Sequence, residues 1–172
     1  MRVLFIISIA YILSPLIYSH SIESQIFGDF WPDGGKRTVY TTRRNIEGES
    51  VYHGPYQRFY ETGELAEQGS YEDGKREGPW SWFFESGKVK AHCVYEKDEG
   101  VFTQMFPGGQ KQLQGRIVGT DREGLWTEWY PSGNKRMQGE FRTGKQHGKW
   151  SYWDDQSGRL LRTMLWDNGE PL

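Results

Sequence analysis

Cysteine is nearly absent from the chain: Cys93 is the single one among 172 residues. No disulfide can therefore form within the chain, and no zinc site built from several cysteines is available. An excess of basic charge is absent too, because 21 lysines and arginines stand against 23 aspartates and glutamates. Proteins that bind nucleic acid ordinarily carry a basic stripe, so we expect no nucleic-acid partner.

The short motifs that carry catalysis are also missing. The sequence contains no phosphate-binding glycine-rich loop ending in Lys-Ser or Lys-Thr, no Gly-x-Ser-x-Gly elbow and no His-Glu-x-x-His motif. We therefore predict no catalytic residues, no cofactor and no enzymatic activity.

Long apolar stretches are confined to the amino terminus. Arg2 is followed by an apolar run from Val3 to Ile17 and then by Ser19-His20-Ser21, an order typical of a secretory signal peptide. The run of 15 residues is shorter than the roughly 20 that a bilayer-spanning helix needs. We predict a signal peptide over residues 1–21, cleaved after Ser19 or Ser21, and an exported mature chain with no integral membrane span. An uncleaved anchor and a misassigned start are the alternatives.

What the chain does have is aromatic side chains and glycine. Aromatic residues make up 16% of the chain while all hydrophobic residues together reach 35%, and there are 22 glycines. Aromatic side chains favour strands and frequent glycine favours many turns. We therefore predict an all-β protein built from many short strands.

Glycine and aromatic residues recur with a fixed period. The glycines that start each unit are separated by 24, 22, 24 and 24 residues: Gly54, Gly78, Gly100, Gly124 and Gly148. Two residues after each comes a ring: Tyr56, Trp80, Phe102, Trp126 and Trp150. Five residues after each comes another large apolar residue: Phe59, Phe83, Met105, Trp129 and Trp153. A tandem period of this length indicates a repeat architecture.

Each unit is predicted to be a β-hairpin of about 24 residues, because its second half alternates with a period of two. One face ends in a large apolar residue, and the residues between are mostly polar and are expected to face water. Hairpins of this kind gain stability by stacking on their neighbours. Residues 22–53 are expected to hold a degenerate first repeat and residues 54–172 five more, giving an elongated antiparallel sheet of about six hairpins. The glycines expected at turns with positive φ are Gly54, Gly63, Gly78, Gly87, Gly124, Gly133 and Gly148.

The first strand of each unit carries rings on both faces. Residues at the fifth position are expected to lie opposite the second-position rings, because side chains alternate along a strand. In one interpretation, twist or fold-back of the sheet buries both sets. In the other, the fifth-position row stays exposed as an aromatic ribbon that binds a partner surface or sugar rings. The ribbon consists of Phe59, Phe83, Trp129 and Trp153.

Cys93 stands where other units have Gly69, Gly115 and Gly139, so this position is expected to hold a small buried residue. His53 and His147 precede start glycines. Equivalent positions of adjacent hairpins lie about 9–10 Å apart, which is too far for ligands of one zinc ion. We therefore expect exposed histidines and no metal site.

The unit Gly-Lys-x-x-Gly-x-Trp, followed by Tyr-x-x-Gly, resembles the MORN-variant repeat of bacterial proteins labelled YwqK-family antitoxins. The likeness runs from about Asp29 to Leu172 and is clearest in Gly78-Pro79-Trp80, Gly124-Leu125-Trp126 and Gly148-Lys149-Trp150. The third unit departs from it, with Asp98-Glu99 in place of Gly-Lys. The resemblance implies a long sheet of stacked hairpins that contacts a protein or a membrane.

These observations favour an exported, non-catalytic interaction module or scaffold at the cell envelope, whether periplasmic, cell-surface or secreted, with an unidentified protein as partner. One alternative is binding of a glycan or other envelope polymer through the aromatic ribbon. Another is neutralisation of a partner protein, as the antitoxin label implies. A hydrolase is the third, but a glycosidase needs two carboxyl groups converging in a cleft, which an array of hairpins does not predict.

Overall fold

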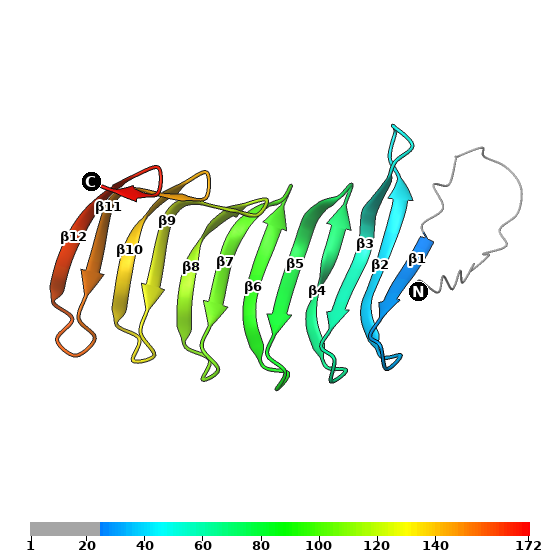
Figure 1. The fold of residues 1–172 in the computed structure, drawn as a ribbon, viewed down its shortest axis with the longest axis horizontal. Helices are drawn as coiled ribbons and strands as arrows, with labels where there is room; N and C mark the ends of the chain where they lie inside the picture. The colour runs from blue at the N-terminus through cyan, green and yellow to red at the C-terminus, as the bar shows by residue number, and fades with distance from the viewer. Residues whose placement is uncertain (1–24) are drawn as a thin grey trace, which may run out of the picture.

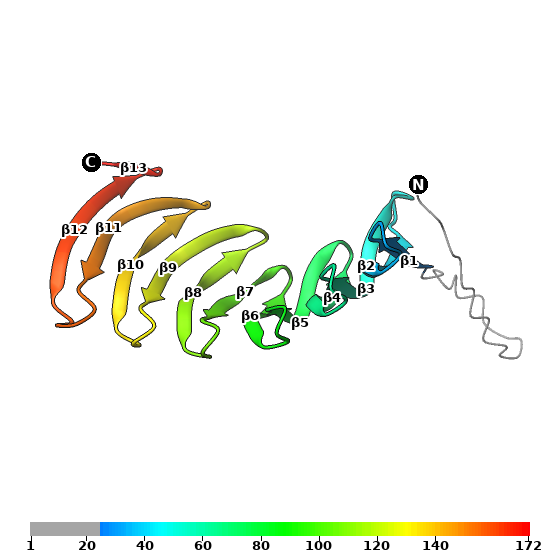
Figure 2. The same ribbon diagram turned by 60° about the horizontal axis from the view of Figure 1, so that its bottom comes forward.

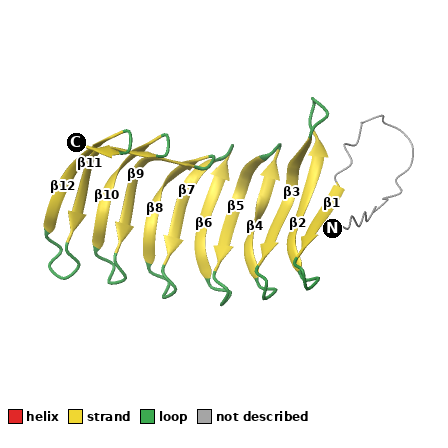
Figure 3. Ribbon diagram, viewed as in Figure 1, coloured by secondary structure: helices red, strands yellow, loops and turns green. Residues whose placement is uncertain are grey.

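The computed structural model describes residues 25–172. Within that range the chain forms one open sheet of 13 strands, each hydrogen-bonded to its neighbours in chain order (Figure 1). Between residues 25 and 172 there is no helix, and so none that could span a bilayer (Figure 3). The predicted signal peptide, residues 1–21, lies outside the described residues.

The predicted all-β fold of stacked antiparallel hairpins is confirmed. The units starting at Gly54, Gly78, Gly100, Gly124 and Gly148 form the hairpins β3–β4, β5–β6, β7–β8, β9–β10 and β11–β12, and β1–β2 precedes them. The strands are β1 (Gln25–Phe30), β2 (Lys36–Arg44), β3 (Ser50–Phe59), β4 (Leu65–Glu72), β5 (Lys75–Phe83), β6 (Val89–Glu96), β7 (Glu99–Met105), β8 (Lys111–Val118), β9 (Asp121–Trp129), β10 (Lys135–Arg142), β11 (Lys145–Trp153), β12 (Leu160–Asp167) and β13 (Glu170–Pro171).

The sheet is a single layer. Figure 2 shows the hairpins following one another along the molecule, each bowed into an arc, with no second layer against them in the part of the chain described. A sheet without a covering layer must bury apolar surface through contacts between its own neighbouring strands. The packing of one hairpin on the next therefore supplies the core.

The turns within the hairpins lie together at one end of the sheet, which we call the tip end. In β3–β4 the Tyr60 amide donates to the Glu64 carbonyl at 2.9 Å, and the Gly63 amide donates to the Tyr60 carbonyl at 3.0 Å. The tip glycines Gly63, Gly87 and Gly133 have φ values of 94°, 76° and 93°. Residues with a Cβ are disfavoured there by about 1–2 kcal/mol, which explains the recurrence of glycine.

The other four glycines predicted for turns do not lie in turns. Gly54, Gly78, Gly124 and Gly148 lie inside β3, β5, β9 and β11, with φ values of 89°, 67°, 65° and 68°. Each sits at a bulge, where its strand contains two more residues than the strand it pairs with. For example, Gln68 pairs with Ser81 and Ser70 pairs with Glu77, so two steps along β4 match four steps along β5. A turn and a bulge both recruit glycine for positive φ, so the spacing alone did not separate them.

The junction between β6 and β7 has no such bulge. His92 pairs with Thr103 and Tyr95 pairs with Gly100, so one register continues along both strands. Gly100 accordingly lies outside the left-handed region. The missing bulge accounts for the interval of 22 residues between Gly78 and Gly100, where the other intervals are 24.

Three tryptophans hold consecutive hairpins together by lying on glycine. The rings of Trp80, Trp126 and Trp150 cover Gly69, Gly115 and Gly139 of the preceding hairpin so closely that a Cβ there would come within 2.1–2.2 Å of ring atoms. Each indole N–H also donates to a carbonyl of that hairpin, at 3.0, 3.0 and 3.2 Å, from Trp80 to Ser70, from Trp126 to Arg116 and from Trp150 to Glu140.

Arginine side chains close two of these rings from solvent. The Arg76 guanidinium lies 4.8 Å from the Trp80 ring centroid, and that of Arg122 lies 4.6 Å from Trp126. With its arginine in place, Trp80 is 0% exposed although the sheet has one layer. Cation–π contacts of this geometry stabilise by about 0.5–2 kcal/mol.

The rings of the aromatic face form a continuous ladder across the sheet. Adjacent centroids from Phe27 through Trp80 to Trp150 lie within 6.3 Å of one another. Cys93 takes the place of glycine where the next ring is Phe102, and it is buried as predicted for a small residue. Rings stacked this way add about 0.5–1.5 kcal/mol per pair beyond the area they bury.

Gly115→Ala is expected to destabilise the sheet, because its Cβ would lie 2.2 Å from the Trp126 ring. Over-packing of this kind costs about 1–3 kcal/mol, which thermal unfolding followed by circular dichroism reports as a lower Tm. Gly28→Ala is the matched control, since its Cβ would meet its neighbours at an ordinary 3.6 Å. Equal melting temperatures for the two variants would contradict the ring-on-glycine packing.

Candidate functional site

The sheet presents two chemically different faces. The aromatic face carries the second-position rings, Tyr56, Trp80, Phe102, Trp126 and Trp150, with their cross-strand partners. The opposite face, here called the polar face, carries an uninterrupted row of hydrogen-bonding side chains. That row runs through Gln57, Gln68, Ser81, His92, Thr103, Gln114, Thr127, Gln138, Ser151 and Thr163.

Side chains within this polar row bond to each other. The Gln114 amide donates to the Thr103 hydroxyl at 3.0 Å, and the Gln138 amide donates to the Thr127 hydroxyl at 2.8 Å. Both threonines are buried. Cross-strand pairs of this kind stabilise a sheet and fix its register, so the polar row holds neighbouring strands in register across the polar face.

Two residues further along each strand, toward the end opposite the tips, the same face exposes aliphatic side chains. Pro79 pairs with Val94, Val101 with Arg116, Leu125 with Glu140 and Lys149 with Leu165. The exposed fractions are 66% for Val94, 56% for Val101, 56% for Leu125 and 55% for Leu165. We call Pro79, Val94, Val101, Leu125 and Leu165 the aliphatic row.

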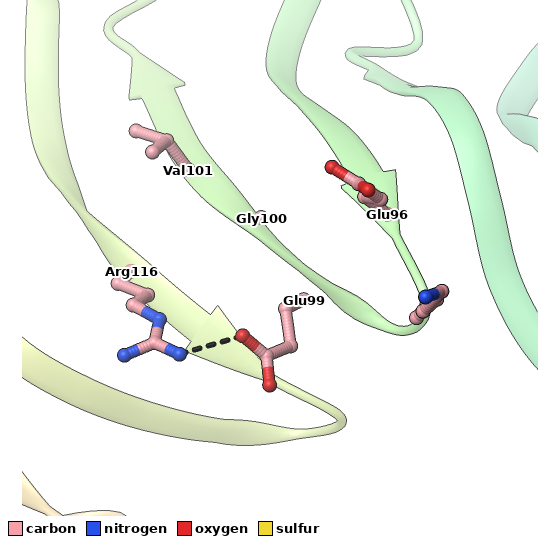
Figure 4. A pocket seen from close by; sticks show the side chains of 6 residues that line it. Glu96, Glu99, Gly100, Val101 and Arg116 are labelled. Carbon is pink, nitrogen blue, oxygen red and sulfur yellow. Dashed lines mark hydrogen bonds and ion pairs between the residues drawn. The ribbon is translucent and has the colours of Figure 1, made fainter.

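A hollow of ≈ 410 Å³ adjoins the centre of the aliphatic row. Val101, Glu96, Glu99 and Arg116 line it from β6, β7 and β8 (Figure 4). Arg116 donates to the Glu99 carboxylate at 2.6 Å across one side, whereas Glu96 makes no ion pair or side-chain hydrogen bond within residues 25–172. The hollow lies beside the bulge-free junction of β6 and β7, where the repeat departs from its pattern.

The four residues of the predicted aromatic ribbon lie together along the tip end. Phe59, Phe83, Trp129 and Trp153 are the last residues of β3, β5, β9 and β11, and all four are half-buried. The sheet does not fold back over them, and part of each side chain stays exposed. Met105 occupies the equivalent position at the end of β7, so the row of rings is interrupted.

Contacts between neighbouring tips hold these residues. The Tyr60 hydroxyl donates to the Phe83 carbonyl at 2.6 Å, and the Tyr130 hydroxyl donates to the Trp153 carbonyl at 3.0 Å. The ammonium groups of Lys111 and Lys135 lie 5.9 and 5.6 Å from the ring centroids of Trp129 and Trp153. In the C-terminal half, the tip end is therefore a strip of alternating lysine and tryptophan.

The two histidines that precede start glycines lie beside acids of neighbouring turns. The His53 Nδ1 atom is 3.9 Å from Asp73, and the His147 Nδ1 atom is 3.4 Å from Asp167. Across residues 25–172 no three histidine, cysteine or acidic side chains converge in a way that could hold a metal ion. No described feature of these histidines indicates catalysis.

Burial controls the ionisation of the aromatic face. Burial raises the pKa of Tyr95 to about 12, and burial together with the nearby Glu67 carboxylate raises the pKa of Tyr56 to about 12. Burial also raises the pKa of the Cys93 thiol. A buried thiol with a raised pKa is a poor nucleophile, so Cys93 fills space rather than reacting.

Sequence reasoning missed the aliphatic row. Its members are the alternate residues of strands whose other face holds the rings, and the residues two positions away on the same face are mostly polar, so the pattern predicted a solvated face. Val94 and Val101 stand out only when β6 is laid beside β7. The shortened interval of 22 residues and the Asp98-Glu99 turn were the available signals of an irregular junction there.

The free energy of unfolding is expected to fall as the pH rises from 10 to 12. Below pH 10, Tyr56 and Tyr95 are neutral in both states and the full stability is present. Above it, the unfolded tyrosines ionise while the folded ones keep their protons until about pH 12. Melting temperature against pH measures the decline, and a double variant, Tyr56→Phe with Tyr95→Phe, should flatten it. An equally steep decline in that variant would contradict the assignment.

Comparison with known proteins agrees with the hairpin repeats. The family described as MORN repeat variant matches residues 52–73, 76–97 and 122–142, which are the hairpins β3–β4, β5–β6 and β9–β10. No curated protein matches the sequence. Among solved structures, the crystal structure of TarM aligns with 56% of this chain and 19% of its own at 13% identity, with a TM-score of 0.39; so low a score carries no argument. Repeats of the matched family suit the binding of other molecules, and three hairpins of this chain are similar to the MORN repeat variant.

Proposed function

We propose that this chain is an exported, non-catalytic interaction module of the cell envelope that docks a partner protein on its polar face. The aliphatic row carries the proposal. Val94 and Val101 stand mostly exposed on adjacent strands at the centre of a face that no other described element covers. Exposed apolar side chains gathered in one place mark interaction surfaces.

The chemistry around the aliphatic row fits a protein better than a sugar polymer. Sugar rings are recognised by stacking on aromatic faces, and the row contains none. Protein interfaces combine an apolar centre with a rim of hydrogen-bonding groups. The polar row from Gln57 to Thr163 runs alongside and supplies such groups on every strand from β3 to β12.

The hollow beside Val101 gives the partner a point of attachment. Glu96 lines it with a carboxylate that makes no ion pair among residues 25–172, Lys97 lines it with an ammonium group that makes none either, and Arg116 is already paired with Glu99. A lysine or arginine of the partner placed here would complete the charge pairing and fix the orientation of the complex. The partner surface is therefore expected to pair apolar side chains with at least one cation.

A second candidate function, binding of an envelope glycan, is favoured by the tip end. Trp129 and Trp153 keep part of their rings exposed, and Lys111 and Lys135 lie beside them. Rings flanked by cations can stack on sugars and attract acidic substituents. A loss of polysaccharide binding in Trp129→Ala and Trp153→Ala, with protein binding retained, would establish this function separately.

Val94→Asp is expected to weaken partner binding more than tenfold, because a charge at the centre of an interface removes apolar contact and is buried unpaired. Binding is measured by retention of the partner from native envelope extract and confirmed by photo-cross-linking from position 101. Val89→Asp is the matched control, since Val89 is an exposed valine of the same strand at the tip end. Equal retention by both variants would place the interface elsewhere.

If the protein is exported, the mature chain is expected to lack residues 1–19 or residues 1–21. Amino-terminal sequencing of the protein from its native source should read from His20 or from Ile22, according to whether cleavage follows Ser19 or Ser21. Fractionation should place the mature chain outside the cytoplasm. A protein that begins at Met1 and stays in the cytoplasm would contradict export while leaving the docking surface untouched.

A further inference from the structure

The aromatic face contains a hollow of ≈ 250 Å³ near the tip end, in the middle of the sheet. Its lining residues come from the hairpins β3–β4 and β5–β6 and from β7. We propose that this hollow binds a single sugar ring that carries a carboxylate, such as a uronic acid. The site lies on the opposite face from the aliphatic row, so the two proposals stand independently.

The hollow exists because small residues occupy its floor. Ala66 and Ala91 are 2% and 3% exposed and both line it. Ala91 pairs with Trp82 across hairpin β5–β6, where the next two hairpins have Leu113 and Met137 at the corresponding position. A longer side chain at residue 91 would fill the space, so the cavity belongs to this hairpin and not to the repeat in general.

One wall of the hollow is aromatic. The rings of Trp82 and Phe102 have centroids 5.5 Å apart and meet at 62°, and both are half-buried. Partly exposed rings at the side of a pocket offer their faces to the C–H groups of a flat ligand. The enclosed volume is below the range of about 300–1,000 Å³ typical of drug-sized ligands, which favours one ring over a longer segment.

Positive charge is in excess around the hollow. The buried Glu67 carboxylate accepts from Arg58 at 3.1 Å and lies 3.6 Å from Arg76, so one acid serves two guanidinium groups. Lys90 also lines the hollow, is exposed and makes no ion pair within residues 25–172. No carboxylate is among the lining residues. A ligand that carries negative charge would balance these cations.

Two unused acceptors select for hydroxyl groups. The Gln104 amide nitrogen donates to Gln112 at 2.9 Å, and the Tyr60 hydroxyl donates to the Phe83 carbonyl at 2.6 Å. These bonds use the Tyr60 hydroxyl hydrogen and one of the two Gln104 amide hydrogens, and they leave the Gln104 Oε1 and Tyr60 Oη atoms as acceptors. A ligand bearing both hydroxyl groups and a carboxylate matches the acceptors and the cations together.

The test is titration of the full mature chain with glucuronate, glucose and acetate, followed by ligand-observed NMR. Glucuronate is expected to bind saturably, with glucose and acetate each weaker, because glucose lacks the charge and acetate lacks the ring. Added salt should weaken glucuronate and leave glucose unchanged. Equal affinity for glucose would overturn the requirement for a carboxylate, and equal affinity for acetate would overturn the requirement for a ring.

Three substitutions locate the site. Lys90→Gln should weaken glucuronate about two- to fivefold, the change expected of one exposed ion pair, whereas Lys88→Gln, the same charge change outside the hollow, should leave it unchanged. Ala91→Leu should abolish binding by filling the space. If Ala91→Leu does not fold, Gln104→Leu serves in its place. Leucine has a similar volume to glutamine but no acceptor, so this variant should bind both glucuronate and glucose more weakly. The proposal would be overturned if glucuronate did not bind at all, or if its affinity were unchanged in both Lys90→Gln and Gln104→Leu. Unchanged glucuronate binding by Val94→Asp would separate this site from the protein-docking face.

Discussion

Three of the five junctions between consecutive hairpins depend on the contact between a tryptophan and a glycine of the preceding hairpin. Trp80, Trp126 and Trp150 lie so close to Gly69, Gly115 and Gly139 that no other residue fits beneath them, and each indole N–H reaches a backbone carbonyl beside that glycine. Bulges at Gly78, Gly124 and Gly148 place the rings there, two residues further along the strand. A single-layer sheet has no second layer to cover its rings, so hairpins can be buried only by one another. The arginines over Trp80 and Trp126 complete that cover on the open side.

One departure from this contact falls between β2 and β3, where Tyr40 faces Tyr56, and another falls between β6 and β7, where the candidate docking surface lies. Cys93 replaces the glycine, Phe102 replaces the tryptophan, and the bulge is missing. The ring ladder continues through the junction, because Phe102 still lies 5.5 Å from Trp82 and 6.3 Å from Trp126. What changes is the polar face: Val94 and Val101 stand exposed on adjacent strands, and the Glu96 hollow opens beside them. A repeat protein that lacks the tryptophan–glycine contact and its bulge at one junction can keep its fold and still differ there in surface chemistry.

Binding chemistry and structural chemistry occupy different parts of the same strands. Along β5, Trp80 is buried against the preceding hairpin, Pro79 belongs to the aliphatic row, and Phe83 ends the strand half-buried at the tips. Alternation of side chains separates the first two, and distance along the strand separates the third. Trp82 shares the face of Trp80 but stands beside the small Ala91, which leaves room for a ligand. The face that holds the protein together therefore also carries a hollow, beside Ala91.

The sequence by itself determined the period, the hairpins and the residues that must be small. Glycine and ring spacing near 24 residues predicted stacked hairpins, and the alignment of Cys93 with Gly69, Gly115 and Gly139 predicted a buried small residue. Only the tertiary structure decided that Gly54, Gly78, Gly124 and Gly148 form bulges and not turns, that Phe83 and Trp153 are half-buried, and that Val94 lies beside Val101. The physical reason is that positive φ and alternation are properties of one strand. A row across a sheet depends instead on the register between strands, which the bulges set.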